Sequence, residues 1–281
     1  MRLEPVTGGI GAEVREMDFS VSVGEQAAEE LRRALDRYLV LFVRGQAIDR
    51  PRQKQITEIF GPLSRLPYVE PMADDPDMVA VLKEADETNV GVFGGDWHSD
   101  FSFLERPPGG SLLHAVAVPP CGGDTLWANQ ILAYETLPDD LKSFVTPRRA
   151  VHLGAPYGVK FAPPEKTRSG RSIRMTRGDP QADIERLHPA VRTHPRSARK
   201  ALFLNPIYTT RFEDMSVADS APILGRLYAH MTRPEFCCRH RWRAGDLAIW
   251  DNRTTLHFAV NDYDGQRRLL HRTTFAGERP I

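Results

Sequence analysis

Most of this chain consists of short apolar runs separated by residues that interrupt regular structure. After Gly61, Pro, Gly, Asp and Asn separate the runs MVAVLK, SLLHAVAV, DTLWAN, KALFLN, DLAIWDN and LLHRTTF. Runs this short, rich in branched and aromatic residues, are typical of β-strands, whereas helices need longer periodic stretches. Many short strands are typical of a jelly roll. The sequence therefore predicts a mainly β protein with flanking helices.

The helical signal is clearest in the first 61 residues and thins beyond them. From Gly24 to Tyr38, apolar residues recur at helical spacing, which predicts an amphipathic helix. The period then changes, because Leu39 to Val43 is wholly apolar and ends before Gly45, as expected of a buried strand. A second short helix is predicted in RQKQITEIFG, closed by Gly61.

Length and composition favour one domain over residues 1–281. A chain of 281 residues suggests two domains by length alone, but all-β folds often reach this size as one. No shift in composition marks a boundary. The segment 156–183 is rich in Pro, Gly and Arg and lacks periodicity, so it is expected to be a lid or an irregular insertion.

The charge balance argues against a polyanionic partner. Lys and Arg number 37 and Asp and Glu also number 37, so no global field recruits nucleic acid or an anionic membrane. We therefore expect a small-molecule substrate. Three cysteines, Cys121, Cys237 and Cys238, are too few for a disulfide framework. There is no signal-peptide pattern and no run of about eighteen apolar residues, so a soluble cytoplasmic protein is predicted.

The stretch GGDWHSDFSF places a histidine and an aspartate two residues apart among aromatic residues. In an extended strand, His98 and Asp100 would point to one face while Trp97 and Phe101 face the other way. The pair could simply face solvent, as in any half-buried strand. It could also offer a nitrogen and a carboxylate for chemistry.

A third candidate ligand, His257, follows an apolar run and the turn-forming residues Asp251 and Asn252. A barrel brings such strand ends together, so His257 could join His98 and Asp100. Two neutral imidazoles and one carboxylate match the facial triad, which binds Fe(II) and leaves three positions open. The bare pattern is common, however, in a chain with nine histidines.

Two arginines strengthen the case for a site. Arg268 and Arg272 are four residues apart and share a face in a strand or a helix. Buried guanidinium groups require anionic partners, and a dicarboxylate cosubstrate would supply them through bidentate hydrogen bonds. The alternative is a solvated basic edge.

Taken together, the motifs resemble the taurine/2-oxoglutarate dioxygenase family of Fe(II)-dependent oxygenases. They are W-H-x-D, G-G-D-T-x-W and W-D-N-R-x-x-x-H followed by Q-R-R-x-x-x-R, in this order, and the likeness extends over nearly the whole chain. The resemblance implies a double-stranded β-helix, a form of jelly roll. It also implies that the enzyme uses Fe(II), 2-oxoglutarate and O2, hydroxylates an unactivated C–H bond and releases succinate and CO2. C–X cleavage or desaturation is an alternative outcome of the same reaction.

The resemblance assigns roles to individual residues. His98, Asp100 and His257 match the iron ligands of the family. Thr125 and Arg268 match the residues that hold the distal carboxylate of 2-oxoglutarate. Arg272 matches an arginine close to both the cosubstrate and the anionic group of the substrate. Family likeness further implies a homodimer or homotetramer.

The substrate pocket departs from the taurine enzyme. Leu66 occupies the position of its sulfonate-binding histidine, and Phe93 and Gly94 stand where it has polar contacts for the amine. A protonated amine would find little to pair with, so taurine is doubtful and a larger or less polar anion is expected. Substrate contact is assigned to Arg272 and to the wall residues Leu66, Tyr68, Val69, Phe93, Gly94 and Phe101.

Two other functions compete with the dioxygenase. One is a catalytically silent jelly-roll protein that binds a metal or an anion, but it would have little need of both metal and cosubstrate groups. The other is a zinc hydrolase built on the same triad, but no additional base near the metal is evident in the sequence.

Overall fold

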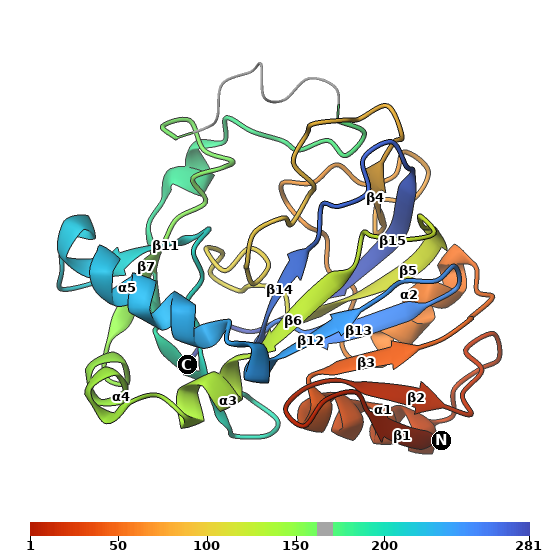
Figure 1. The fold of residues 1–281 in the computed structure, drawn as a ribbon, viewed down its shortest axis with the longest axis horizontal. Coiled ribbons are helices and arrows are strands. Elements are labelled where there is room, and N and C mark those ends of the chain that lie inside the picture. Colours follow the sequence, from red (N-terminus) through yellow and green to blue (C-terminus); the bar gives the residue numbers. More distant parts are fainter. Residues whose placement is uncertain (162–170) are drawn as a thin grey trace.

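Two β-sheets form the centre of the protein (Figure 1). The structure is a computed structural model that describes residues 1–161 and 171–281. One sheet contains, in spatial order, β1 (Arg2–Pro5), β2 (Ala12–Arg15), β3 (Val40–Val43), β13 (Leu247–Asp251), β5 (Gly110–Ala117), β15 (Arg268–Phe275) and β4 (Val79–Lys83). The other contains β12 (Cys237–His240), β6 (Thr125–Asn129) and β14 (Thr255–Ala259). Strand pairs are antiparallel except β2 with β3.

The two sheets pack against each other through large apolar side chains. Trp127 on β6 contacts Phe42 on β3 and Trp250 on β13, with ring centroids 5.4 Å and 5.9 Å away. All three rings are almost fully buried, which removes a large apolar area from water. This double-sheet core agrees with the predicted jelly roll.

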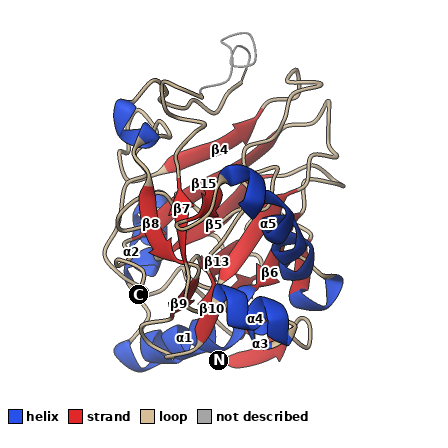
Figure 2. Cartoon of the chain, turned by 90° about the vertical axis from the view of Figure 1, so that its left-hand side faces the viewer, coloured by secondary structure: helices blue, strands red, loops and turns tan. Residues whose placement is uncertain are grey.

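Helices α1 (Glu25–Tyr38) and α2 (Arg50–Glu58) cover the outer face of the large sheet (Figures 1 and 2). The apolar stripe of α1 buries Leu31 and Leu35 against β3 and β13, as the periodicity predicted. Asp49 caps α2 by accepting a hydrogen bond from the backbone N–H of Arg52. The N-terminal expectations of helix, strand and helix are therefore confirmed.

A third group of elements lies beside the two sheets (Figure 2). It contains the sheet β11 (Thr209–Phe212), β7 (Arg149–His152) and β8 (Arg186–Pro189), and the hairpin β9 (Val191–Thr193) and β10 (Lys200–Leu202). Its helices are α3 (Gln130–Glu135), α4 (Asp139–Val145), α5 (Val217–Met231) and the 3-10 turns η2 (Pro180–Asp183) and η3 (Pro234–Phe236).

Three details differ from the sequence-based expectations. Helices do continue beyond Gly61, and the longest, α5, was hidden by its internal Pro222 and Gly225. The run KALFLN is a strand only over Lys200–Leu202. His98 and Asp100 do not lie in a regular strand, because the chain leaves extended geometry for a turn at Asp100.

The expected insertion at 156–183 is described only in part, since residues 162–170 lie outside the described residues. On either side of them, Tyr157, Ile173 and Ala182 are buried in one apolar cluster with Phe101. No helix of the described chain is long and apolar enough to cross a membrane.

Candidate active site

Backbone pairing brings His98 and His257 together, although they are far apart in the sequence. The N–H of His98 donates to the carbonyl of His257 at 3.1 Å, and the N–H of His257 donates back at 2.8 Å. Beside this bridge, Gly94 has φ +77°, and a Cβ there would lie 3.1 Å from Cε1 of His98. A glycine is therefore required where the chain passes over the imidazole.

The two imidazoles and one carboxylate converge on a single point. The Nε2 atoms of His98 and His257 each lie 3.7 Å from Oδ1 of Asp100. The candidate ligand atoms all lie within 4.8 Å of one another. Nδ1 of His98 lies 2.7 Å from the carbonyl of Asp96, which fixes the ring and leaves Nε2 facing the other two ligands. The structure thus assembles the predicted triad.

The charge states of these groups suit a metal ion. Burial lowers the pKa of His98, although the charge of Asp100 opposes this shift, and burial lowers the pKa of His257 well below its ordinary value, so both imidazoles are neutral near pH 7. Burial opposes ionisation of Asp100, but the charge and hydrogen bond of Arg272 and the two neighbouring histidines together outweigh it and lower the pKa of this carboxyl. The site therefore presents two neutral nitrogens and one carboxylate.

The second oxygen of Asp100 is occupied by hydrogen bonds. Oδ2 accepts from Nη2 of Arg272 at 2.6 Å and from Nδ2 of Asn252 at 2.9 Å. Because both donors approach Oδ2, Oδ1 remains the oxygen that faces the histidines. Asn252 was expected only to shape a turn, and its contact with Asp100 is a feature that the sequence interpretation missed.

This donor set fits ferrous iron. Two imidazoles and one carboxylate on one side of an ion are the facial triad, which leaves coordination positions for ligands other than protein. His98, Asp100 and His257 would hold Fe(II), and the bound ion would supply the activation of O2. The protein residues orient these ligands and exclude water from them, since all three side chains are more than nine-tenths buried.

An inner cavity leads from the triad to Thr125 and Arg268. The Thr125 hydroxyl accepts from Nε1 of Trp242 at 3.0 Å and from Nη2 of Arg268 at 3.4 Å. Its own hydrogen is therefore available to donate to another acceptor. Nε of Arg268 is buried and has no partner among the described residues. An anion that reaches this end of the cavity would satisfy both donors.

Arg268 and Arg272 lie on β15 and both line the inner cavity. Both side chains are 3 % exposed, so the alternative of a solvated basic edge is wrong. A dicarboxylate fits the donors at the Arg268 end. There Gly123 has φ +69°, and a Cβ at this position would lie 2.9 Å from Cδ of Arg268, so glycine leaves room for the arginine side chain.

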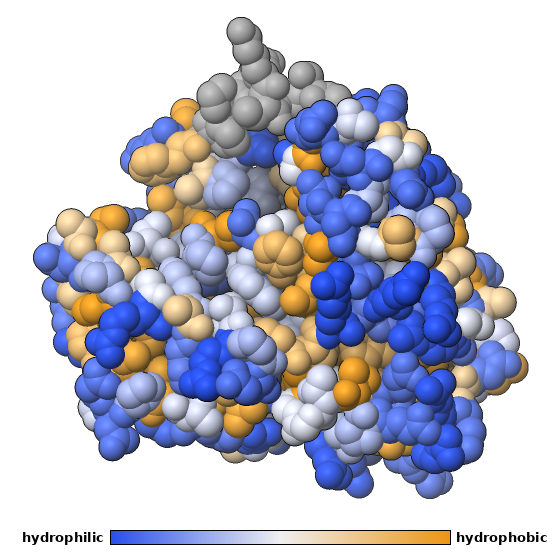
Figure 3. Space-filling model, in the orientation of Figure 1, coloured by the Kyte–Doolittle hydropathy of each residue, from blue (hydrophilic) through white to orange (hydrophobic). Residues whose placement is uncertain are grey.

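An outer pocket opens on the other side of the triad. It has a volume of about 650 Å³, including the part open to solvent, and His98 and Asp100 form part of its wall. Figure 3 shows the surface hollowed between the elements around β7 and those around β4, with hydrophilic and hydrophobic residues mixed at the rim. Other residues of the wall are Phe101, Tyr157, Arg171, Arg177 and Tyr208.

The expected substrate residues divide into two groups. Phe93, Gly94 and Phe101 line the outer pocket beside the triad. Leu66, Tyr68 and Val69 lie one layer behind, packed in the same apolar cluster as Phe101 but outside the lining of this pocket. Phe101 was expected to face away from Asp100, but its φ of +45° turns it to the same pocket.

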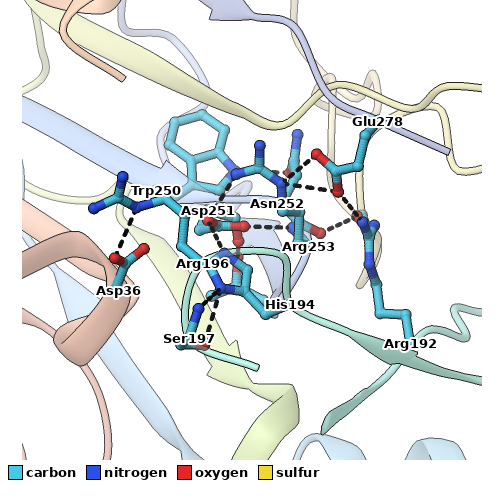
Figure 4. Close-up of polar contacts among 12 residues, drawn as sticks. Asp36, Arg192, His194, Arg196, Ser197, Trp250, Asp251, Asn252, Arg253 and Glu278 are labelled. Carbon is cyan, nitrogen blue, oxygen red and sulfur yellow. Dashed lines mark hydrogen bonds and ion pairs between the residues drawn. The ribbon is translucent and has the colours of Figure 1, made fainter. Parts of the chain in front are cut away.

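A buried polar network holds the loop that carries Asn252 (Figure 4). Asp251 accepts from Nη1 of Arg253 at 3.0 Å and lies 3.0 Å from Nε2 of His194. Arg253 in turn donates to Glu278 at 3.1 Å. Nε1 of Trp250 donates to Oδ1 of Asn252 at 3.0 Å, so the amide is clamped between the core and Asp100.

Several residues of the site carried no clear signal in the sequence. They are Trp242, which holds Thr125, and the outer-pocket residues Tyr157, Arg171, Arg177 and Tyr208. Asn252 belongs to the W-D-N-R motif, so this motif was the one sequence signal that could have identified it. The others lie in stretches without a recognised motif.

Comparison with known proteins agrees with this geometry. The family model described as taurine catabolism dioxygenase TauD, TfdA family, matches residues 2–274. An alpha-ketoglutarate-dependent (2-oxoglutarate-dependent) sulfate ester dioxygenase from Pseudomonas putida is 36% identical over 99% of this chain and 90% of its own. An alpha-ketoglutarate-dependent 2,4-dichlorophenoxyacetate dioxygenase from Cupriavidus pinatubonensis is 34% identical over 94% and 93%.

A solved structure shares the fold. The taurine dioxygenase from Burkholderia xenovorans superposes with a TM-score of 0.83 and 29% identity, over 100% of this chain and 92% of the other. These relatives support the enzyme and give no support to a silent binding protein or a zinc hydrolase. The chain belongs to the TauD/TfdA family and is a dioxygenase that depends on Fe(II) and 2-oxoglutarate.

Proposed function

We propose that this dioxygenase oxidises a small organic anion held in the outer pocket. The observation that carries the proposal is the composition of that pocket: Arg171 and Arg177 line it together with aromatic side chains, and His98 and Asp100 form its inner wall. Arginines attract an anionic head group, and the aromatic rings suit an apolar body. The relatives whose names contain sulfate ester and 2,4-dichlorophenoxyacetate support the same class.

The proposed reaction is hydroxylation of the carbon that is bonded to an ester or ether oxygen or to the sulfur of a sulfonate. One oxygen atom of O2 enters this C–H bond, and the other enters succinate as 2-oxoglutarate loses CO2. In an alkyl sulfate or an aryloxyacetate, the hydroxylated carbon then collapses to a carbonyl compound, which releases sulfate or a phenol. Positioning in the pocket selects the hydrogen that is removed.

Within this reaction we assign roles to the residues of the inner site. His98, Asp100 and His257 hold Fe(II). Thr125 and Arg268 bind the distal carboxylate of 2-oxoglutarate, which would satisfy the unpaired Nε of Arg268. Arg272 orients Asp100, because its Nη2 donates a hydrogen bond to this carboxylate. Arg272 also lines the inner cavity and contributes positive charge there.

Taurine is not the substrate that we propose. Leu66, at the position of the sulfonate-binding histidine, is 8 % exposed and packed in an apolar cluster. Phe93 and Gly94, at the positions of the amine contacts, line the outer pocket. The side chains of Leu66 and Phe93 offer an ammonium group no hydrogen-bond acceptor.

The proposal is tested by a substrate panel. Purified protein with Fe(II), 2-oxoglutarate and O2 is offered hexyl sulfate, hexanesulfonate, phenoxyacetate, taurine and the neutral phenoxyacetamide. We expect substrate-dependent succinate release with at least one of the first three, together with equimolar organic product. Succinate release that occurs only with the neutral phenoxyacetamide would refute the proposal that the substrate is an anion.

Three broader expectations remain predictions. We propose that residues 1–281 form one catalytic domain, that it assembles as a homodimer or homotetramer, and that it works in the cytoplasm. The free cysteines Cys121, Cys237 and Cys238 suit a reducing compartment. Sedimentation equilibrium of the purified protein measures the oligomeric state.

A further inference from the structure

Two tyrosine hydroxyls meet in the wall of the outer pocket. The hydroxyl oxygens of Tyr157 and Tyr208 lie 3.2 Å apart, and each side chain is 4 % exposed. Both residues line the outer pocket, and His98 and Asp100 also form part of its wall. They come from opposite sides of the long 158–207 stretch, so only the tertiary structure brings them together.

Only one of the two hydroxyl hydrogens is donated in the hydrogen bond between Tyr157 and Tyr208. Each hydroxyl has one hydrogen, and one of the two is donated between the rings. Among the described residues, neither hydroxyl makes another hydrogen bond, so the second hydrogen has no protein acceptor. Burial raises the pKa of both tyrosines, which keeps both hydrogens in place near pH 7. A buried donor without an acceptor is unfavourable, so a partner is expected from the pocket.

Arg272, the other candidate for anion binding, is already engaged. Its Nη2 donates to Oδ2 of Asp100 at 2.6 Å and to the hydroxyl of Ser111 at 2.7 Å. Arg272 lines the inner cavity and is not part of the outer-pocket wall. An anion in the outer pocket therefore needs other donors.

The surroundings of the tyrosine pair favour an anionic acceptor. The negative charge of Asp100 acts on the Tyr157 hydroxyl, as do the positive charges of Arg177 and Arg272. Asp100 is itself paired with Arg272, and Arg177 lines the same pocket as Tyr157. Phe101 packs beside both rings, with centroids 5.6 Å from Tyr157 and 6.5 Å from Tyr208. A charged oxygen would thus meet hydroxyl hydrogens next to a cation, while the apolar part of the ligand meets aromatic rings.

We propose that the Tyr157–Tyr208 hydroxyl pair is an oxyanion-binding subsite that receives an oxygen of the substrate's sulfate, sulfonate or carboxylate group. This inference rests on the proposed function, because it requires an anionic substrate in the outer pocket. It makes the two tyrosines specificity-determining residues. They select for an acceptor oxygen and hold the substrate with its neighbouring C–H bond toward the triad.

The test measures binding before any turnover. The anaerobic protein with Fe(II) and 2-oxoglutarate is titrated with phenoxyacetate and with hexyl sulfate, while the visible charge-transfer band of the metal chelate is followed. We compare the wild type, Tyr157→Phe, Tyr208→Phe and the double variant. A single variant keeps one hydroxyl that can turn to the ligand, so the double variant is decisive.

We expect the double variant to bind the better of the two anions about tenfold more weakly or worse, since a hydrogen bond to a charged acceptor is lost. The unperturbed band with Fe(II) and 2-oxoglutarate alone shows that the inner site is intact. Tyr134→Phe is the matched control, because the hydroxyl of this buried tyrosine lies 3.2 Å from that of Thr146 and Tyr134 lines neither pocket. Its affinity for the anion should equal that of the wild type.

Two results would overturn the inference, and they differ. If the folded double variant keeps wild-type affinity for both anions, the hydroxyl pair binds only water and the subsite is wrong, while the proposed function stands. If the wild type binds and oxidises only phenoxyacetamide, the proposed function fails and the subsite fails with it.

Discussion

Asn252 offers a sharp test of how the protein prepares Asp100 for the metal. Its amide nitrogen donates to Oδ2 of Asp100 at 2.9 Å, and its amide oxygen accepts from Trp250 at 3.0 Å. Replacing Asn252 by Ala removes one of the two hydrogen bonds that hold Oδ2. Arg272 alone then has to keep Oδ1 turned toward His98 and His257.

The expected loss follows from the charge of the acceptor. A hydrogen bond to a charged group contributes about 1.5–3 kcal/mol, and about 1.4 kcal/mol changes an equilibrium constant tenfold. Partners that orient a metal ligand typically contribute about ten- to a hundredfold in affinity. We therefore expect the dissociation constant for Fe(II) to rise about ten- to a hundredfold in Asn252→Ala.

The assay is an anaerobic Fe(II) titration in the presence of 2-oxoglutarate, followed by the chelate band. Asn129→Ala is the control, because Asn129 is also buried but caps α3 and donates to the carbonyl of Gly9. Both variants should lose stability in thermal unfolding, but only Asn252→Ala should lose metal affinity. Equal Fe(II) affinity of folded Asn252→Ala and the wild type would refute the reasoning.

Three further predictions test the rest of the site. His257→Ala should abolish Fe(II)-dependent succinate release, since it removes one of three ligands; retained turnover would contradict the triad. Arg268→Ala should raise the KM for 2-oxoglutarate about ten- to a hundredfold, whereas Arg267→Ala should not, because the adjacent Arg267 is exposed and paired with Glu84. Burial, reinforced by Arg192, lowers the pKa of His188 to about 4. The unfolded chain then takes up more protons below about pH 6.5, so stability should fall as the pH falls, by about 2 kcal/mol from this residue between pH 7 and pH 5. Urea unfolding at both pH values measures this, and a pH dependence unchanged in His188→Gln would argue against it.

The fold class and the triad were predictable for identifiable reasons. Short apolar runs with turn residues between them favour strands, and the runs around β5, β6, β13 and β15 were found at nearly their observed bounds. The triad was found because the ligand types of iron are few and the motifs occur in a fixed order. The α5 helix was missed because Pro222 and Gly225 weaken its periodic signal.

By itself, the sequence determined the chemistry that the protein carries: His98, Asp100 and His257 as ligands, and Arg268 and Thr125 as candidates for the cosubstrate. Only the tertiary structure decided how that chemistry is arranged. It turned Phe101 into the outer pocket, set Asn252 against Asp100 and joined the hydroxyls of Tyr157 and Tyr208. The physical reason is that side-chain direction follows from periodicity only within regular elements. Asp100 and Phe101 lie in a turn, and the tyrosines meet through packing between segments that no local pattern connects.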